Sequence, residues 1–228
     1  MSQSPLTVHT LPLGVIGTNC YIAHRADSSQ AIVVDPGDQA DKVLALLSEH
    51  SLTAEAVLIT HCHWDHIGAV APVVQATGAS TWMSEIESPI VEERINDFVP
   101  PGVGPFETCP IDHKLSGGEE FDVAGITVRA IHLPGHSPGT LGFLVDGIPA
   151  EDGTWSSPPV LFVGDLVFLD SVGRVDLPGA DGAQLVQSVR LLLDTLDDAT
   201  VLYPGHGPNT TLGRERTSNP FVAPIAAG

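Results

Sequence analysis

The chain has 228 residues, of which 43% are hydrophobic and 16% charged, so it is globular rather than disordered and long enough to bury a core. No apolar run approaches the ~18 residues of a membrane span, and residues 1–14 lack the basic start and apolar core of an export signal, which predicts a cytoplasmic protein. Nine lysines and arginines against 28 aspartates and glutamates give a formal charge of −19, which opposes nucleic-acid binding because that affinity comes largely from basic side chains on phosphates.

The first half of the chain alternates apolar strands with helices. Residues 31–35 predict a buried strand closed by a Pro-Gly turn, and apolar residues at helical spacing follow at 39–50. Residues 56–60 predict a second buried strand, and a short helix is expected from Gly68 to Gln75. Residues 84–93 begin as a helix, after which prolines and glycines predict a loop.

The second half is richer in strands. Alternating segments predict an antiparallel meander at residues 119–123, 126–133 and 140–145. Residues 147–159 are polar and contain proline and glycine, which predicts a surface loop. Further elements are expected as a strand at 160–163, a helix at 183–193 and a strand at 200–203. Strands followed by helices in both halves predict two sheets with helices outside, in one domain spanning residues 1–228.

Four short motifs each follow the end of a predicted strand and carry metal-ligand side chains. They are His61-Cys62-His63-Trp64-Asp65-His66, Pro134-Gly135-His136, Gly164-Asp165 and Pro204-Gly205-His206. Alternate positions of an extended segment face one side, so His61, His63 and Asp65 are expected to point together, with His66 starting the next helix. Loops at strand ends of one sheet edge can converge on a point. Imidazole and carboxylate ligands suit zinc, and also Fe(II) or Mn(II).

The remaining histidines and the cysteines are interpreted as ordinary residues. The histidines outside the motifs, expected to be solvated or hydrogen-bonded, are His9, His24, His50, His113 and His132. The cysteines, which form no Cys-x-x-Cys pair and are expected to be free thiols away from any metal, are Cys20, Cys62 and Cys109.

These residues resemble the metallo-β-lactamase-fold superfamily, and more narrowly the short, single-domain members of its glyoxalase II-like branch. The resemblance runs from about Leu11 to Phe221. Besides the motifs above, its carrying stretches are Val34-Asp35-Pro36-Gly37, Ser137-Pro138-Gly139-Thr140, Gly173-Arg174-Val175-Asp176 and Arg214-Glu215-Arg216-Thr217-Ser218-Asn219-Pro220-Phe221.

The resemblance implies a four-layer αββα sandwich of the α/β class and a site for two divalent metal ions, zinc in the first place and iron or manganese as alternatives. The first ion would be held by His61, His63 and His136. The second would be held by Asp65, His66 and His206. Asp165 would bridge them, and family members hold a hydroxide between the metals as the nucleophile, which Asp65 is expected to orient.

Four further residues are expected to support the ligands. Asp35 and Thr60 are placed to hydrogen-bond the ligand loop, since metal-bound imidazoles need such partners. Arg174 and Asp176 are expected to form an ion pair beside the loop after Asp165, although an ordinary surface pair is the alternative interpretation.

The leading functional hypothesis is hydrolysis of a thioester, such as S-lactoylglutathione or a related acyl-thiol, with that small molecule as the only partner expected. The full-length glyoxalase II enzymes grip glutathione with a C-terminal domain, whereas the tail here offers only Arg214 and Arg216. The alternatives are a persulfide (sulfur) dioxygenase with one Fe(II) on His61, His136 and Asp165, and a lactonase or β-lactamase-type hydrolase. A degenerate scaffold domain fits poorly with a full ligand set. The sequence leaves the oligomeric state open.

Overall fold

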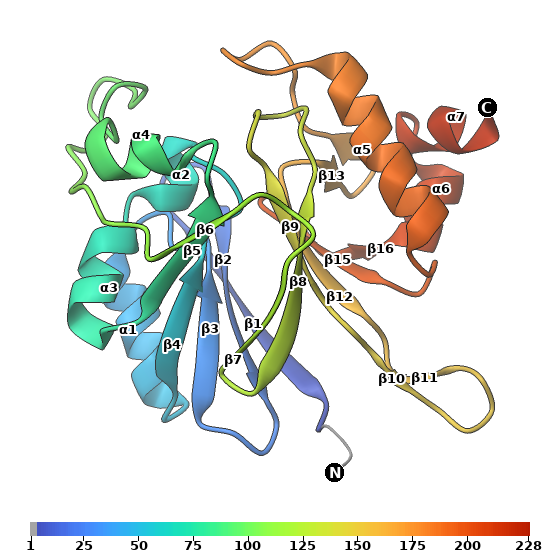
Figure 1. The fold of residues 1–228 in the computed structure, drawn as a ribbon, viewed down its shortest axis with the longest axis horizontal. Coiled ribbons are helices and arrows are strands. Elements are labelled where there is room, and N and C mark those ends of the chain that lie inside the picture. Colours follow the sequence, from blue (N-terminus) through green and yellow to red (C-terminus); the bar gives the residue numbers. More distant parts are fainter. Residues whose placement is uncertain (1–3) are drawn as a thin grey trace.

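In residues 4–228, which the computed structural model describes, two six-stranded β-sheets lie face to face with helices on their outer sides (Figure 1). Residues 1–3, the start of the segment read for an export signal, lie outside the described residues. Within the described part, no helix combines the length and apolar character that a membrane crossing requires.

The first sheet is built from the N-terminal half and has the strand order β1-β2-β3-β4-β5-β6. Its strands are β1 (Leu6–Leu13), β2 (Thr18–Arg25), β3 (Gln30–Val34), β4 (Thr53–Leu58), β5 (Ser80–Ser84) and β6 (His113–Leu115). The first three strands pair antiparallel, and the pairs from β3 to β6 are parallel. Its outer helices are α1 (Ala40–Glu49), α2 (Trp64–Ile67), α3 (Val70–Thr77) and α4 (Ser88–Glu93).

The second sheet has the order β16-β15-β12-β9-β8-β7. Its strands are β7 (Glu120–Val123), β8 (Ile126–His132), β9 (Leu141–Val145), β12 (Val160–Gly164), β15 (Val201–Pro204) and β16 (Thr210–Thr211). The helices on its outer side are α5 (Gly182–Thr195), α6 (Leu212–Ser218) and α7 (Val222–Ala227). Two small hairpins stand apart, namely β10 (Ile148–Pro149) with β11 (Trp155–Ser157), and β13 (Val167–Phe168) with β14 (Ser171–Val172).

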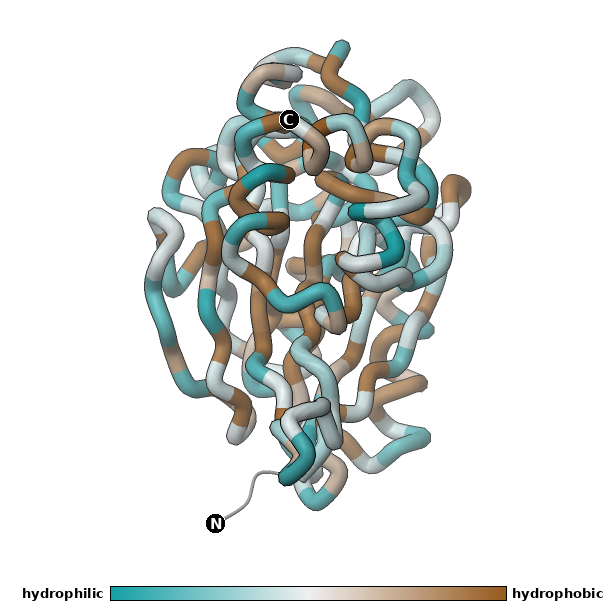
Figure 2. The backbone as a smooth tube through the Cα atoms, turned by 90° about the vertical axis from the view of Figure 1, so that its right-hand side faces the viewer, coloured by the Kyte–Doolittle hydropathy of each residue, from teal (hydrophilic) through white to brown (hydrophobic). Residues whose placement is uncertain are grey.

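Three apolar clusters fill the spaces between four layers, because the central strands are apolar on both faces. In β3, Val33 belongs to the cluster under α1 and α3, whereas its neighbour Ile32 belongs to the cluster between the sheets. In β12, Phe162 faces the other sheet and Leu161 faces α5. Apolar stretches accordingly run along the central strands (Figure 2). The predicted α/β sandwich of four layers is confirmed.

Strand directions bring the ligand motifs to one edge. β8 and β12 both pair antiparallel with β9, so they run in the same direction, and β15 is parallel to β12. The segments that follow these three strands therefore leave the second sheet at a common edge. In the first sheet β3 and β4 are parallel, which likewise places Asp35 beside the segment that begins at Thr60.

The structure corrects two sequence expectations. Residues 147–159 were expected to be a surface loop, but they form the β10–β11 hairpin, in which Ala150 N–H donates to the Thr154 carbonyl at the turn. No strand was predicted in the segments that form β1, β2, β5, β6, β13, β14 and β16. Polar residues interrupt the alternation in segments such as β2 (TNCYIAHR). In β1 the interruption is Pro12, which an edge strand tolerates.

Phe143 provides a test of the layer between the sheets, because its side chain is fully buried there. We expect Phe143→Ala to lower the free energy of unfolding by about 3–5 kcal/mol, the cost of lost burial plus a cavity. Phe221→Ala is the matched control, since Phe221 is 54% exposed and should change stability by less than about 0.5 kcal/mol. Urea unfolding measures both, and equal destabilisation would contradict this account of the core.

Candidate metal centre

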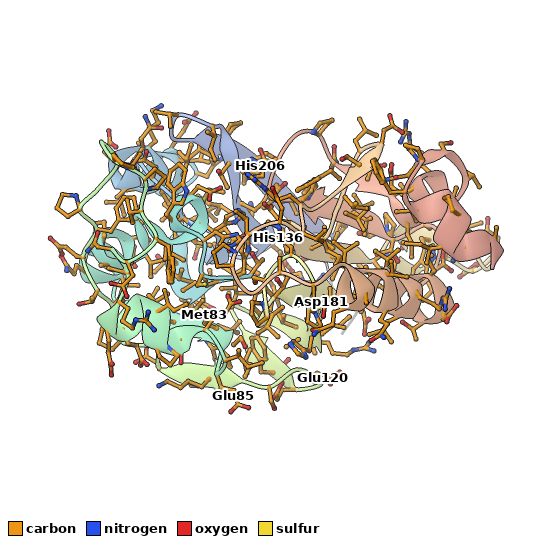
Figure 3. All side chains as sticks on the ribbon, turned by 90° about the horizontal axis from the view of Figure 1, so that it is seen from above. Met83, Glu85, Glu120, His136, Asp181 and His206 are labelled. Atoms are coloured by element: carbon orange, nitrogen blue, oxygen red, sulfur yellow. The ribbon has the colours of Figure 1, made fainter. Side chains whose placement is uncertain are left out.

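The structure brings together all the residues predicted as metal ligands. Their ligand atoms form three groups, each with all atoms within 4.8 Å of one another: His61 with His63 and His136, His61 with His66 and Asp165, and Asp65 with His66 and His206. Figure 3 labels His136 and His206, which lie near each other where the two halves of the molecule meet. The groups share members, so they form one continuous cluster.

The ring of His61 is held by Thr60 and Asp35. The Thr60 hydroxyl donates to Asp35 Oδ2 at 2.7 Å and lies 3.0 Å from His61 Nδ1, while the Thr60 backbone N–H donates to Asp35 Oδ1 at 2.8 Å. Because the hydroxyl proton is used on Asp35, His61 Nδ1–H donates to the hydroxyl oxygen. His61 Nε2 is then a bare lone pair directed into the cluster.

Asp35 also orients His66. His66 Nδ1 lies 2.9 Å from Asp35 Oδ2, and the contact directs Nε2 toward Asp65 and Asp165, whose nearest oxygens are 3.3 and 3.5 Å away. Asp35 holds a left-handed backbone with φ of 50°, which non-glycine residues adopt at a cost. One buried carboxylate thus positions two histidines of the cluster, the arrangement common around metal-bound imidazoles.

A backbone carbonyl fixes the third ring. His136 Nδ1 donates to the Arg174 carbonyl at 2.9 Å, which leaves Nε2 free to face His63 Nδ1 at 2.8 Å. His61, His66 and His136 therefore offer Nε2 to the cluster, whereas His63 offers Nδ1.

Asp165 lies between the two ends of the cluster. Its Oδ2 is 3.5 Å from His136 Nε2 and also 3.5 Å from His206 Nε2. Asp65 Oδ2 lies 3.3 Å from His206 Nε2 and accepts a hydrogen bond from the Thr18 hydroxyl at 2.7 Å. A single carboxylate at this place can reach a cation on either side.

The electrostatics of the cluster favour cations. Burial keeps His61 neutral by lowering its pKa well below 6.5, and burial together with His136 lowers the pKa of His63 to about 4. Burial alone would raise the pKa of Asp165, but the charge of His66 outweighs it and keeps the carboxyl ionised. Burial likewise opposes protonation of His66, yet Asp65 and Asp165 raise its pKa well above 6.5. The carboxylates thus draw positive charge to this point.

The innermost atoms have the chemistry of metal donors. Within the described residues, His61 Nε2, His66 Nε2 and Asp165 Oδ1 are buried and have no hydrogen-bond partner. A buried polar atom without a partner costs free energy, so such atoms are rare unless a ligand satisfies them. Nitrogen and oxygen donors in groups of three fit borderline divalent ions such as zinc or iron. The residues present therefore fit divalent metal.

Close backbone approach is needed at Gly205. A Cβ atom on this residue would lie 2.1 Å from Asp165 Oδ1 and 2.6 Å from His66 Cε1. Only glycine lets the segment before His206 pass this close to the carboxylate. The glycine of the Pro-Gly-His motif thus allows His206 to reach the cluster, because it has no Cβ atom to collide with Asp165.

The predicted ion pair of Arg174 and Asp176 is present at the site's edge. Arg174 Nε and Nη2 donate to the two Asp176 oxygens at 2.7 and 2.8 Å. Both side chains are more than 60% exposed, so the pair contributes little to stability. Its connection to the cluster is the Arg174 carbonyl, which accepts from His136.

Sequence reasoning missed several residues that hold the ligand segments. The Asn19 side chain donates to the carbonyls of Pro204 and Gly207 at 3.0 and 2.8 Å, so it fixes both sides of His206. Thr18, next to it, holds Asp65. A polar pair between a glycine turn and an apolar strand carries no metal-site signal, since its partners are distant in sequence.

Glu87 is the other residue that was missed. Its side chain is buried, with Oε2 accepting from the Cys62 backbone N–H at 2.7 Å and Oε1 accepting from the Gly139 backbone N–H at 2.8 Å. Cys62 stands between two ligand histidines, and Gly139 lies in the turn that follows His136. One carboxylate therefore ties together the segments that carry three histidines. It is one of several glutamates in residues 84–93, so the sequence did not single it out.

An open cavity of about 610 Å³ adjoins the cluster and is lined by its members His63, Asp65, His136, Asp165 and His206. This volume is within the range of small-molecule sites, ~300–1,000 Å³. Cys62 also lines it, and burial raises the pKa of this thiol, so it is not a ready nucleophile. All three cysteines are free.

The tail arginines lie elsewhere. Arg214 pairs with Asp170 and Glu215, and Arg216 donates to Asp198 and to the Leu193 carbonyl. Neither is among the residues that line the cavity. Their contacts hold α6 in place beside the second sheet. Neither arginine is therefore placed to contact a substrate in the cavity.

A family model for the metallo-β-lactamase superfamily matches residues 13–147. The chain belongs to this superfamily. Among curated proteins it is similar to the hydroxyacylglutathione hydrolase GloC of Haemophilus influenzae, at 30% identity over 95% of this chain and 98% of that protein. It is thus a metal-dependent hydrolase of the metallo-β-lactamase superfamily, whose fold binds divalent metals.

Two solved structures are similar over almost their whole length. BLEG-1, a B3 metallo-β-lactamase, has a TM-score of 0.82 and 33% identity, covering 95% of this chain and 99% of that chain. TTHA1623 in a di-iron-bound form has a TM-score of 0.76 and 36% identity, covering 93% and 99%.

Glu87→Gln tests the link between the ligand segments. An amide offers one acceptor oxygen instead of two, so one of the two backbone N–H groups loses its partner. We expect metal affinity to fall about tenfold or more, as it does when groups that orient metal ligands are changed. Glu85→Gln is the matched control, because Glu85 is exposed and lies at the rim of the molecule (Figure 3). Competition with a chromophoric chelator measures both, and equal affinities would refute the role of Glu87.

Proposed function

We propose that this chain is a binuclear metallohydrolase that cleaves a thioester of a small acyl-thiol. The observation that carries the two-metal assignment is the position of Asp165. One of its oxygens lies equally far from His136 and His206, which belong to different ligand groups. A carboxylate so placed is suited to bridge two ions, with His61, His63 and His136 around the first and Asp65, His66 and His206 around the second.

The thioester assignment is supported by the similarity to GloC, which is named a hydroxyacylglutathione hydrolase. The similarity to BLEG-1 makes β-lactam cleavage the alternative that an activity panel must include. We propose zinc as the metal, because the donors are imidazole and carboxylate in groups of three. The di-iron form of TTHA1623 keeps iron as the second choice.

Different residues of the chain have different roles in the proposed hydrolysis. Divalent ions held here would polarise the thioester carbonyl and make water a better nucleophile at neutral pH. Asp65 both belongs to the cluster and lines the cavity, so its carboxylate is placed to orient the attacking water. Water adds to the carbonyl carbon, the carbon–sulfur bond breaks, and the products are a carboxylic acid and a thiol. Asp35, Thr60 and the Arg174 carbonyl keep the imidazoles in fixed orientations throughout.

Asp165→Asn tests this mechanism, since it keeps the shape of the side chain but removes its charge. We expect bound metal to fall from two ions to one or none. Thioester hydrolysis should fall by more than about 100-fold, beyond the loss caused by changing a group that only orients a ligand. Asp194→Asn, on the exposed side of α5, should retain metal and activity.

The measurements are metal analysis of the purified variants and kcat/KM on thioester, β-lactam and lactone substrates. Two metals and most of the turnover in Asp165→Asn would refute the bridging role. The dioxygenase assignment would replace the hydrolase assignment if the wild-type chain held one iron, consumed oxygen with a persulfide and hydrolysed no thioester.

A further inference from the structure

We infer that the substrate of this site is a thioester with an apolar acyl group on an uncharged thiol, rather than on an anionic carrier such as glutathione. The inference rests on the proposed thioester hydrolysis and adds the substrate class. It comes from the side chains that surround the cavity beyond the metal ligands.

Apolar side chains from three separate segments face the cavity. Ile16 comes from the turn between β1 and β2, Ile90 and Phe98 come from α4 and the segment after it, and Leu177 comes from the segment that precedes α5. Ile86, from the segment just before α4, also lines it. The metal ligands His63 and Asp65 line the same cavity, so a substrate carbonyl beside them would share the cavity with these apolar groups.

Several of these side chains are exposed to water in the absence of a substrate. Ile16 is 52% exposed, Ile86 49% and Phe98 55%. Large apolar side chains that are exposed together beside a polar cluster mark a binding surface, because covering them removes apolar area from water. An acyl chain in the cavity would cover apolar area of this kind.

Away from the metal ligands, the cavity offers little to bind an anionic carrier. The one lysine or arginine among the lining residues is Arg174, and its guanidinium is already paired with both oxygens of Asp176. Three carboxylates line the cavity, of which Asp65 and Asp165 are metal ligands and Glu87 is not, and the chain as a whole carries a formal charge of −19. Glutathione would bring two carboxylates and one ammonium. Within the described residues, no unpaired cationic side chain lines the cavity to receive those carboxylates.

The first experiment compares acyl chains and carriers. Acetyl, butyryl, hexanoyl and octanoyl thioesters of N-acetylcysteamine, which is uncharged, are assayed beside the same thioesters of glutathione. Each methylene removed from water should raise kcat/KM about fourfold, so burial of only two would favour octanoyl over acetyl about fifteenfold. The N-acetylcysteamine ester should also be the better substrate of each pair. A flat or falling series, or a tenfold preference for glutathione esters, would overturn the inference.

The second experiment assigns the effect to the cavity. Phe98→Ser should lower the octanoyl-to-acetyl ratio at least about threefold, because it removes apolar area from the lining. Phe221→Ser makes the same change at a residue of nearly equal exposure, 54%, outside the lining, and should leave the ratio within about twofold. Equal ratios in the two variants would also overturn the inference.

A binding measurement separates this inference from the proposed function. The S-octyl and S-methyl thioethers of N-acetylcysteamine cannot be hydrolysed, so calorimetry on the wild-type protein reports binding alone. We expect tighter binding of the octyl compound with a negative heat-capacity change, the marker of apolar burial. A protein that shows this preference but hydrolyses no thioester would contradict the proposed function and leave the apolar site standing. A protein that hydrolyses thioesters but binds both thioethers equally would contradict the inference alone.

Discussion

The structure depends on holding carboxylate oxygens and unprotonated imidazole nitrogens together at one buried point. Unless a cation is present there, the carboxylates repel one another and the nitrogens lack hydrogen-bond partners. His61 and His66 are fully buried, and their Nε2 atoms have no hydrogen-bond partner in the described chain. Such an arrangement is unfavourable alone, so the surrounding fold must enforce it. Asp35 holds the ring of His61 through Thr60 and holds the ring of His66 directly. Glu87 holds the backbone segments at Cys62 and Gly139.

The sandwich provides the stiffness that this enforcement needs. The ligands lie on segments that follow strand ends, and the strands themselves are packed on both faces. Phe162 and Leu161 of β12, for example, fill different apolar clusters, which leaves Asp165 little freedom at the end of that strand. Asn19 adds a cross-link between the two halves, because it lies on β2 of the first sheet and donates to the end of β15 of the second and to Gly207 just after it. The cluster is thus assembled from both sheets.

The sequence was informative where the chemistry is local. His61, His63, Asp65 and His66 lie within six residues of one another, so a short motif was enough to predict that they are ligands of one site. The common direction predicted for His61, His63 and Asp65 holds only in part, because Asp65 already lies in α2 and groups with His66 and His206. Glu87 and Asn19 could not be found this way, because each acts through backbone groups that are distant in the chain. Strands β1 and β5 were missed for a related reason. Their polar residues are satisfied by tertiary partners, as when Thr81 donates to the Pro110 carbonyl, and no local pattern records that.

The apolar side chains proposed to contact the substrate lie on different segments from the metal ligands. The turn that carries Ile16 and the segment that carries Phe98 belong to loops, which vary more readily than the strands that hold the ligands. A shared ligand set can therefore serve different substrates in one superfamily, and function has to be argued from the cavity as well as the cluster. The most direct test of the central claim is anomalous diffraction from crystals of the metal-loaded protein, recorded at the absorption edge of the bound metal. The account predicts two peaks about 3.5–4 Å apart, both in contact with Asp165. A single peak at full metal loading, with His66 and His206 unbound, would contradict it.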